Sequence, residues 1–118
     1  MHVLLLRPVP GNDRFGLGPF FRIEPLGLEY VAAALEMRGH RATVADLRYS
    51  RSVDRLLRAT RPAIVGLACM HALETDEVLA LARDLVSRSG CGFLMVTHSA
   101  RLAATLDRRV NLHAGVIA

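Results

Sequence analysis

The segment RIEPLGLEYVAAALEMRGH, residues 22–40, decides the expected fold of this chain. It predicts a helix over residues 25–38, in which Pro25 suits the first turn and Gly39 suits the position just past the end. Four apolar residues recur at helical spacing and form one face of that helix: Leu28, Val31, Ala32 and Leu35. A hydrophobic strand over residues 3–6 precedes the segment, and a second strand over residues 42–47 follows it. The chain therefore opens as a strand, a long loop, a helix and a strand.

The same alternation continues along the chain. Further strands are predicted over residues 63–69, 92–97 and, more weakly, 109–113, and further helices over residues 52–60, 75–88 and 100–107. The inward faces of the second and third helices are Val53, Leu56 and Leu57, and then Val78, Leu81, Ala82 and Leu85. Alternating strands and helices indicate a parallel sheet. We expect one α/β domain over residues 1–118, with a flavodoxin-like open parallel sheet of five strands in the order 2-1-3-4-5 and helices on both faces.

In that strand order the ligand crevice lies beyond the carboxyl ends of strands one and three. The two loops that flank it are residues 8–24 and 70–74, and a loop as long as the first is usually functional or disordered.

Composition excludes several classes of function. The 118 residues carry 15 basic side chains, all of them arginine, and a net charge of +4. The arginines are scattered and no aromatic platform accompanies them, so no nucleic-acid partner is expected. No apolar run is long enough to span a membrane and no leader peptide is evident, which makes a cytoplasmic location the expectation. Cys69 and Cys91 form no metal motif and are expected to be buried free thiols.

Three common functions of this architecture fit the sequence poorly: dinucleotide binding, phosphoryl acceptance and flavin phosphate binding. A dinucleotide fingerprint would need a third glycine where Phe21 stands. A phosphoryl-accepting receiver needs an aspartate after strand three and a lysine after strand five, whereas the chain has Cys69-Met70 after strand three and no lysine anywhere. A flavodoxin phosphate loop is rich in serine and threonine, and residues 10–21 contain neither.

Residues 1–90 resemble the N-terminal cobalamin-binding domain of radical S-adenosylmethionine enzymes, above all the hopanoid C-3 methylase group. Four segments carry the resemblance: VLLLRP (3–8), RIEPLGLE (22–29), GHRATVADL (39–47) and RPAIVGL (61–67). The resemblance implies bound cobalamin and a radical S-adenosylmethionine catalytic domain, supplied in trans if it is separate.

A corrinoid is a wide, mostly apolar disc, so its crevice needs small residues, apolar surface and backbone donors. Glycines permit close approach of the ligand. The expected cofactor-binding residues are Pro8, Gly16, Gly18, Phe20, Phe21, Glu24, Leu26, Gly27, Gly66, Ala68, Cys69, Met70, His71 and His98. Phe20 and Phe21 could equally pin the loop to the core, and Gly27 could serve only helix packing.

The chain departs from related patterns in ways that limit its chemistry. Cobalamin mutases carry Asp-x-His-x-x-Gly after the first strand, whereas residues 13–16 here read DRFG, so no histidine of that motif ligates cobalt. His71 is the one histidine beside the crevice that could reach the metal. The Cys-x-x-x-Cys-x-x-Cys cluster motif is absent, so no catalytic residue is assigned and the chain is not expected to be an enzyme on its own.

Residues 91–118 form an atypical tail that is expected to complete the sheet. The stretch VTHSARLAATLDRRV (96–110) resembles the switch-histidine segment of ABC transporter ATPases. A P-loop requires Gly-x-x-x-x-Gly-Lys-Ser/Thr, and the chain has no lysine. The sequence thus predicts a cobalamin-binding module, truncated or fused. A non-catalytic interaction or remnant domain with an empty crevice and a nucleotide-binding regulator remain as alternatives.

Overall fold

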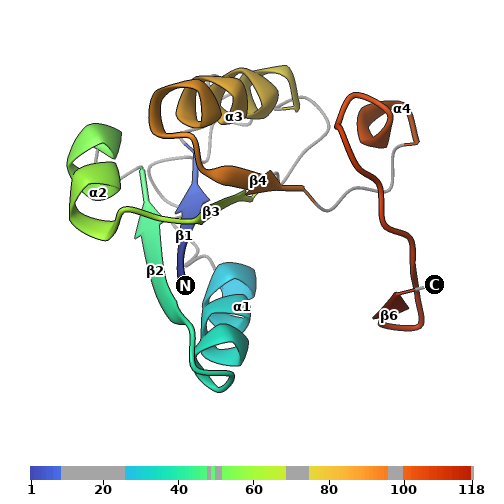
Figure 1. Cartoon of the computed structure of the whole chain (residues 1–118), viewed down its shortest axis with the longest axis horizontal. Coiled ribbons are helices and arrows are strands. Elements are labelled where there is room, and N and C mark those ends of the chain that lie inside the picture. Colours follow the sequence, from blue (N-terminus) through green and yellow to red (C-terminus); the bar gives the residue numbers. More distant parts are fainter. Residues whose placement is uncertain (9–25, 48, 50–51, 69–74, 96–99, 118) are drawn as a thin grey trace, which may run out of the picture.

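A computed structural model describes residues 1–8, 26–47, 49, 52–68, 75–95 and 100–117. The first part of the chain alternates strand and helix: β1 (His2–Arg7), α1 (Leu26–Glu36), β2 (Arg41–Asp46), α2 (Val53–Thr60), β3 (Ile64–Leu67), α3 (Thr75–Ser89) and β4 (Gly92–Leu94). A short helix α4 (Ala100–Ala103) and two short strands, β5 (Leu112–His113) and β6 (Val116–Ile117), follow (Figure 1). The predicted α/β class is confirmed.

The main sheet has four parallel strands in the order β2-β1-β3-β4. β1 lies between β2 and β3, with Leu5 opposite Val44 on one side and opposite Gly66 on the other. This arrangement reproduces the first four positions of the predicted order. Strand four, predicted over residues 92–97, ends at Leu94, and residues 96–97 lie outside the described residues.

The predicted fifth strand of the main sheet is wrong. β5 pairs antiparallel with β6, and the two make a separate two-stranded sheet. The turn between them explains the reversal, because Ala114 has φ 48° and Gly115 has φ 79°. Two consecutive residues with positive φ form the tight turn that matches the twist of a hairpin. The segment therefore folds back on itself instead of lying beside β4.

Helices cover both faces of the main sheet, as predicted. Leu4, Leu6, Ala45, Leu47 and Val65 are buried on one face, where side chains of α2 and α3 pack against them. The inward residues predicted for these helices are confirmed: Val53, Leu56, Leu57 and Leu81 pack against the core, and Val78, Ala82 and Leu85 are buried. α1 packs against β2 and β1 and lies on the other side of the strands from α3 (Figure 1).

Helix α1 is less buried than its sequence predicts. Leu28, Ala32 and Leu35 are half-buried, but Val31 is 48% exposed and no residue of the helix is fully buried. Leu26 and Tyr30 on the outward side are also exposed. The helix is apolar almost all round, so its spacing alone did not fix which side faces the sheet.

Local signals fix the ends of the helices. Ser52 caps α2, where its hydroxyl accepts a hydrogen bond from the Arg55 amide at 3.3 Å. After α1 the chain turns through Gly39, whose φ is +81°, and the Gly39 and His40 amides donate to the carbonyl oxygens of Glu36 and Leu35 at 3.0 and 3.1 Å. A glycine in this conformation avoids the strain that a side chain would introduce.

Replacing Gly39 with alanine is expected to lower the free energy of unfolding by about 1–2 kcal/mol, because the alanine would be held in the left-handed region. Gly27→Ala is the matched control, since Gly27 lies in α1 without positive φ and nothing lies within 4 Å of an added Cβ. That change is expected to be neutral or to stabilise by up to about 1 kcal/mol. Urea unfolding of both variants checks the pair, and equal effects would contradict the turn assignment.

Candidate functional site

The predicted crevice corresponds to one edge of the main sheet. β1 and β3 are neighbours and end at this edge with Arg7 and Leu67, while β2 ends there with Asp46. The backbone stays paired beyond the strand ends: the Ala68 amide donates to the Leu6 carbonyl at 3.0 Å, and the Leu47 amide donates to the Arg7 carbonyl at 2.9 Å. In open α/β sheets, ligands bind outside the carboxyl ends of the strands where the strand order reverses. That point here is the boundary between β1 and β3.

The structure describes five of the residues predicted to bind a cofactor. Pro8 and Ala68 directly follow the two neighbouring strands and are half-buried at the edge. Leu26 and Gly27 begin α1, and both are exposed. The remaining nine lie outside the described residues: Gly16, Gly18, Phe20, Phe21, Glu24, Cys69, Met70, His71 and His98. The structure thus brings Pro8 and Ala68 to one edge.

Gly66 lies inside β3, before the crevice edge. A Cβ added there would lie 2.8 Å from Cδ2 of Leu5, whose side chain is almost wholly buried. The side chain of Leu5, on the neighbouring strand, therefore fills the space that a side chain at position 66 would occupy. Close strand packing gives this glycine a structural role whether or not a ligand approaches it.

Two charged residues at the same edge were not among the predicted site residues. Arg7 and Asp46 are the last residues of β1 and β2, stand opposite each other in the pairing, and are half-buried. Their positions at the ends of adjacent parallel strands were the available signal, because such ends share one sheet edge. They place one positive and one negative side chain beside the predicted crevice.

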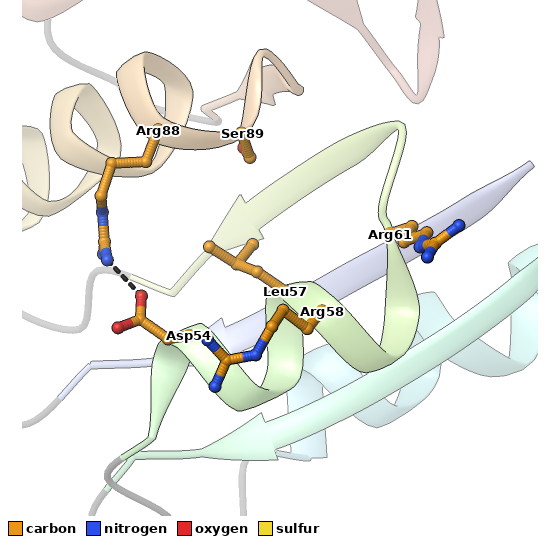
Figure 2. Close-up of a pocket in the computed structure, with 6 residues that line it drawn as sticks. All are labelled: Asp54, Leu57, Arg58, Arg61, Arg88 and Ser89. Atoms are coloured by element: carbon orange, nitrogen blue, oxygen red, sulfur yellow. Dashed lines mark hydrogen bonds and ion pairs between the residues drawn. The ribbon is translucent and has the colours of Figure 1, made fainter.

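A surface groove lies elsewhere, between α2 and the end of α3 (Figure 2). Its volume is about 340 Å³, and six residues line it: Asp54, Leu57, Arg58, Arg61, Arg88 and Ser89. Leu57 supplies apolar surface, and three of the other five side chains are guanidinium groups. This groove is built from the helices on one face of the sheet and is separate from the crevice at the strand ends.

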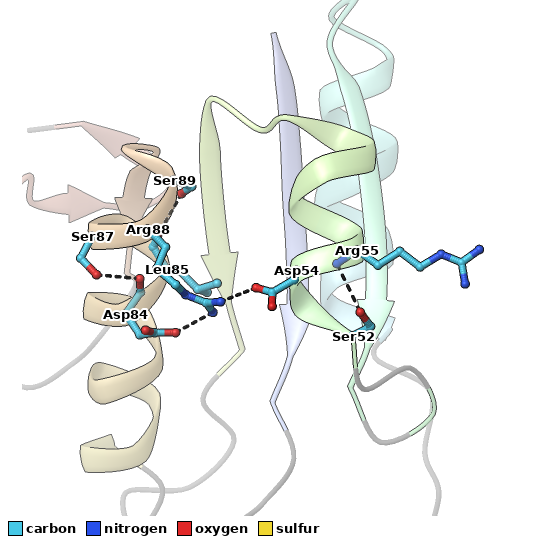
Figure 3. Close-up of polar contacts among 8 residues, drawn as sticks. All are labelled: Ser52, Asp54, Arg55, Asp84, Leu85, Ser87, Arg88 and Ser89. Carbon is cyan, nitrogen blue, oxygen red and sulfur yellow. Dashed lines mark hydrogen bonds and ion pairs between the residues drawn. The ribbon is translucent and has the colours of Figure 1, made fainter.

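Arg88 links the two helices (Figure 3). Its guanidinium forms ion pairs with Asp54 of α2 and, at 2.6 Å, with Asp84 one turn earlier in α3. Desolvation lowers the pKa of Arg88, but the hydrogen bonds that it donates to Asp84 and Asp54 and the negative charges of both carboxylates outweigh this effect, so the pKa lies above its ordinary value. All three side chains are exposed, so these ion pairs contribute little to stability.

The described residues also define one buried thiol. Cys91 is free and buried, as predicted, and its sulfur accepts a hydrogen bond from the Ser89 hydroxyl at 2.9 Å. Cys69 lies outside the described residues. No group of three or more metal-binding side chains occurs among the residues that the structure describes. Across those same ranges, no helix has the length and apolar character needed to cross a bilayer.

The chain is similar to two different kinds of curated protein. Hopanoid C-3 methylase of Methylococcus capsulatus is 36% identical over 88 residues, which cover 72% of this chain and 17% of the methylase. The lipoprotein-releasing system ATP-binding protein LolD of Shewanella frigidimarina is 31% identical over 105 residues, which cover 89% of this chain and 39% of that protein. LolD of Anaeromyxobacter dehalogenans is 42% identical over 79 residues, or 67% of this chain and 31% of its own length.

These similarities are partial on the side of the relatives. The chain spans less than half the length of each of them, and no family model or solved structure matches it. The likeness to the ATPases extends well beyond the C-terminal tail in which the sequence predicted it. The chain thus has an α/β fold, and it is partially similar to a hopanoid C-3 methylase and to LolD ATP-binding proteins.

Proposed function

We propose that this chain is a cobalamin-binding module that serves a radical S-adenosylmethionine enzyme of methyltransferase or cyclase type. The observation that carries the proposal is the similarity to hopanoid C-3 methylase over 72% of the chain. The strand order supports it, because β2-β1-β3-β4 creates a switch point between β1 and β3. The two loops predicted to hold the corrinoid, residues 8–24 and 70–74, follow these two strands in the sequence.

The described residues at the crevice edge offer both apolar and charged side chains to a corrinoid. Pro8 and Ala68 give small apolar surface at the edge, and Arg7 and Asp46 could interact with the polar amides at the rim of a corrinoid. A cobalamin also carries a nucleotide tail, which we expect to run beside β3 at Gly66 and Ala68. Leu5 occupies the space above Gly66, so the tail would have to pass Leu5 or displace it. Cobalamin would supply the methyl-carrying cobalt chemistry, while this chain would hold and orient it. The two cysteines provide no iron–sulfur motif, so catalysis would belong to a partner domain.

A second candidate is a nucleotide-binding module, favoured by the similarity to LolD ATP-binding proteins. Phosphate binding in such proteins depends on a glycine-rich loop with a lysine that reaches the phosphates. This chain contains no lysine, so it lacks that cation. A non-catalytic interaction domain with an empty crevice is the third candidate, and it would bind neither ligand.

Calorimetric titrations separate the three candidates. With hydroxocobalamin, the protein is expected to give a saturable one-to-one binding curve, whereas Mg-ATP should give no micromolar binding. Micromolar binding of Mg-ATP without corrinoid binding would favour the second candidate. Heats of dilution alone with both ligands would favour the third.

A further inference from the structure

We propose that the groove between α2 and α3 binds a small organic phosphate. The site is independent of the corrinoid crevice and uses the groove residues described above. Its volume of about 340 Å³ falls at the lower end of the range for small-molecule pockets, about 300–1,000 Å³. A monophosphate with a short carbon skeleton is of suitable size.

The charges of the groove favour an anion. Arg88 already faces Asp54 and Asp84, so its charge is locally neutralised. Arg58 and Arg61 line the same groove, and among the described residues neither guanidinium has an ion-pair partner. Two uncompensated guanidiniums beside an apolar surface match a phosphate attached to a carbon chain. Guanidinium groups bind phosphate oxygens bidentately, which favours phosphate over a simple halide.

The groove contains one ion-paired arginine, Arg88, and two arginines whose side chains can change conformation, Arg58 and Arg61. Figure 2 shows Arg88 reaching from α3 to Asp54, with Leu57 between the helices. In the same view Arg58 and Arg61 extend from α2 in different directions, and no dashed line joins either side chain to a carboxylate. Both residues are exposed, so their long side chains can reorient toward a ligand seated on Leu57.

Arg61 also has an unusual backbone conformation for an arginine. Arg61 ends α2 in the left-handed region, at φ 42° and ψ 60°, where its amide donates to the Leu57 carbonyl at 2.9 Å. Glycine is the favoured residue at such a position. An arginine there costs stability, and Arg58 already provides a cation in the last turn of α2. In this proposal, contact between the Arg61 side chain and the ligand offsets the cost of the left-handed conformation.

The test is a titration of the full chain with glycerol 2-phosphate at constant ionic strength, followed by amide chemical shifts. Saturable shifts are expected in α2 and the end of α3, with a dissociation constant in the millimolar range because the groove is open to solvent. Arg58→Gln and Arg61→Gly should each weaken binding by about threefold to fivefold, the scale of one exposed charge interaction. Arg55→Gln is the matched control, since it removes a charge from α2 on a side chain directed away from α3 (Figure 3).

Thermal unfolding separates lost binding from lost folding. Arg61→Gly should raise the melting temperature, because glycine relieves the left-handed strain, while it weakens phosphate binding. The proposal is overturned if no saturation occurs by tens of millimolar, or if inorganic chloride at equal ionic strength produces the same shifts. It is also overturned if Arg55→Gln weakens binding as much as Arg58→Gln, because binding would then reflect diffuse positive charge.

Discussion

Replacing Leu4 with alanine is expected to lower the free energy of unfolding by about 2–5 kcal/mol. Leu4 is fully buried in β1, and its side chain lies in the core that α2 and α3 cover. β1 is an inner strand with a partner on each side, so the surrounding backbone has little freedom to collapse into the cavity. A domain of this size has only a modest margin of stability, and such a loss would leave a large fraction of the chain unfolded at moderate temperature.

Leu94→Ala is the matched control for this measurement. The substitution removes the same atoms as Leu4→Ala, but Leu94 lies in the edge strand β4 and is 65% exposed. Its effect on the unfolding free energy is expected to stay within about 0.5 kcal/mol. Urea unfolding of both variants gives the comparison. Equal losses in the two variants would contradict the placement of β1 in the centre of the sheet.

Gly66→Val is expected to lower the free energy of unfolding by about 1–3 kcal/mol, because it overpacks the contact between β3 and β1. The first added carbon would already lie 2.8 Å from Cδ2 of Leu5. Leu5 is 4% exposed, so its side chain has little room to move aside. The better strand propensity of valine offsets only part of this cost.

A double-mutant cycle with Leu5→Ala identifies the cause. If the clash with Leu5 produces the loss, Gly66→Val should cost little or nothing in the Leu5→Ala background, with a coupling energy of about 0.5–3 kcal/mol. Unfolding in urea measures all four corners of the cycle. If Gly66→Val lowers the free energy of unfolding as much in the Leu5→Ala variant as in the native chain, a contact other than Leu5 requires the glycine.

The central part of the fold could be predicted from sequence because several signals agree there. α2 and α3 have polar outer faces, so the spacing of Leu56, Leu57 and Leu85 pointed to one inward side, and the structure confirms it. The long loop after β1 and the alternation of strands and helices likewise indicated a switch point. Sequence signals and packing therefore agree from β1 through α3.

Two mismatches have local physical causes, and a third is that α4 ends at Ala103 instead of the predicted residue 107. Helix α1 carries apolar residues on its outward side as well, so periodicity could not show that Val31 would be exposed. The sequence pattern places the fifth strand wrongly because it does not show the hairpin turn at Ala114-Gly115, where φ is 48° and 79° and the chain reverses. A two-residue turn outweighed the expectation that the tail would extend the sheet.

The functional sites were predictable to different degrees. Topology indicated the crevice edge, because the ends of parallel strands lie at the same edge of the sheet, where Pro8 and Ala68 follow β1 and β3. The sequence does not indicate the arginine groove, because Arg61 and Arg88 are distant in sequence and line one groove only in the folded chain. Each arginine taken alone was typical of a solvated helix face.

The proposed cobalamin function is tested most directly by the visible spectrum of the purified chain after mixing with hydroxocobalamin and desalting. Our account predicts a corrinoid absorption band that elutes with the protein in a ratio near one to one. The same treatment of the Leu4→Ala variant under unfolding conditions should leave the protein colourless, because the crevice depends on the folded sheet. A colourless native protein at full hydroxocobalamin excess would contradict the cobalamin assignment.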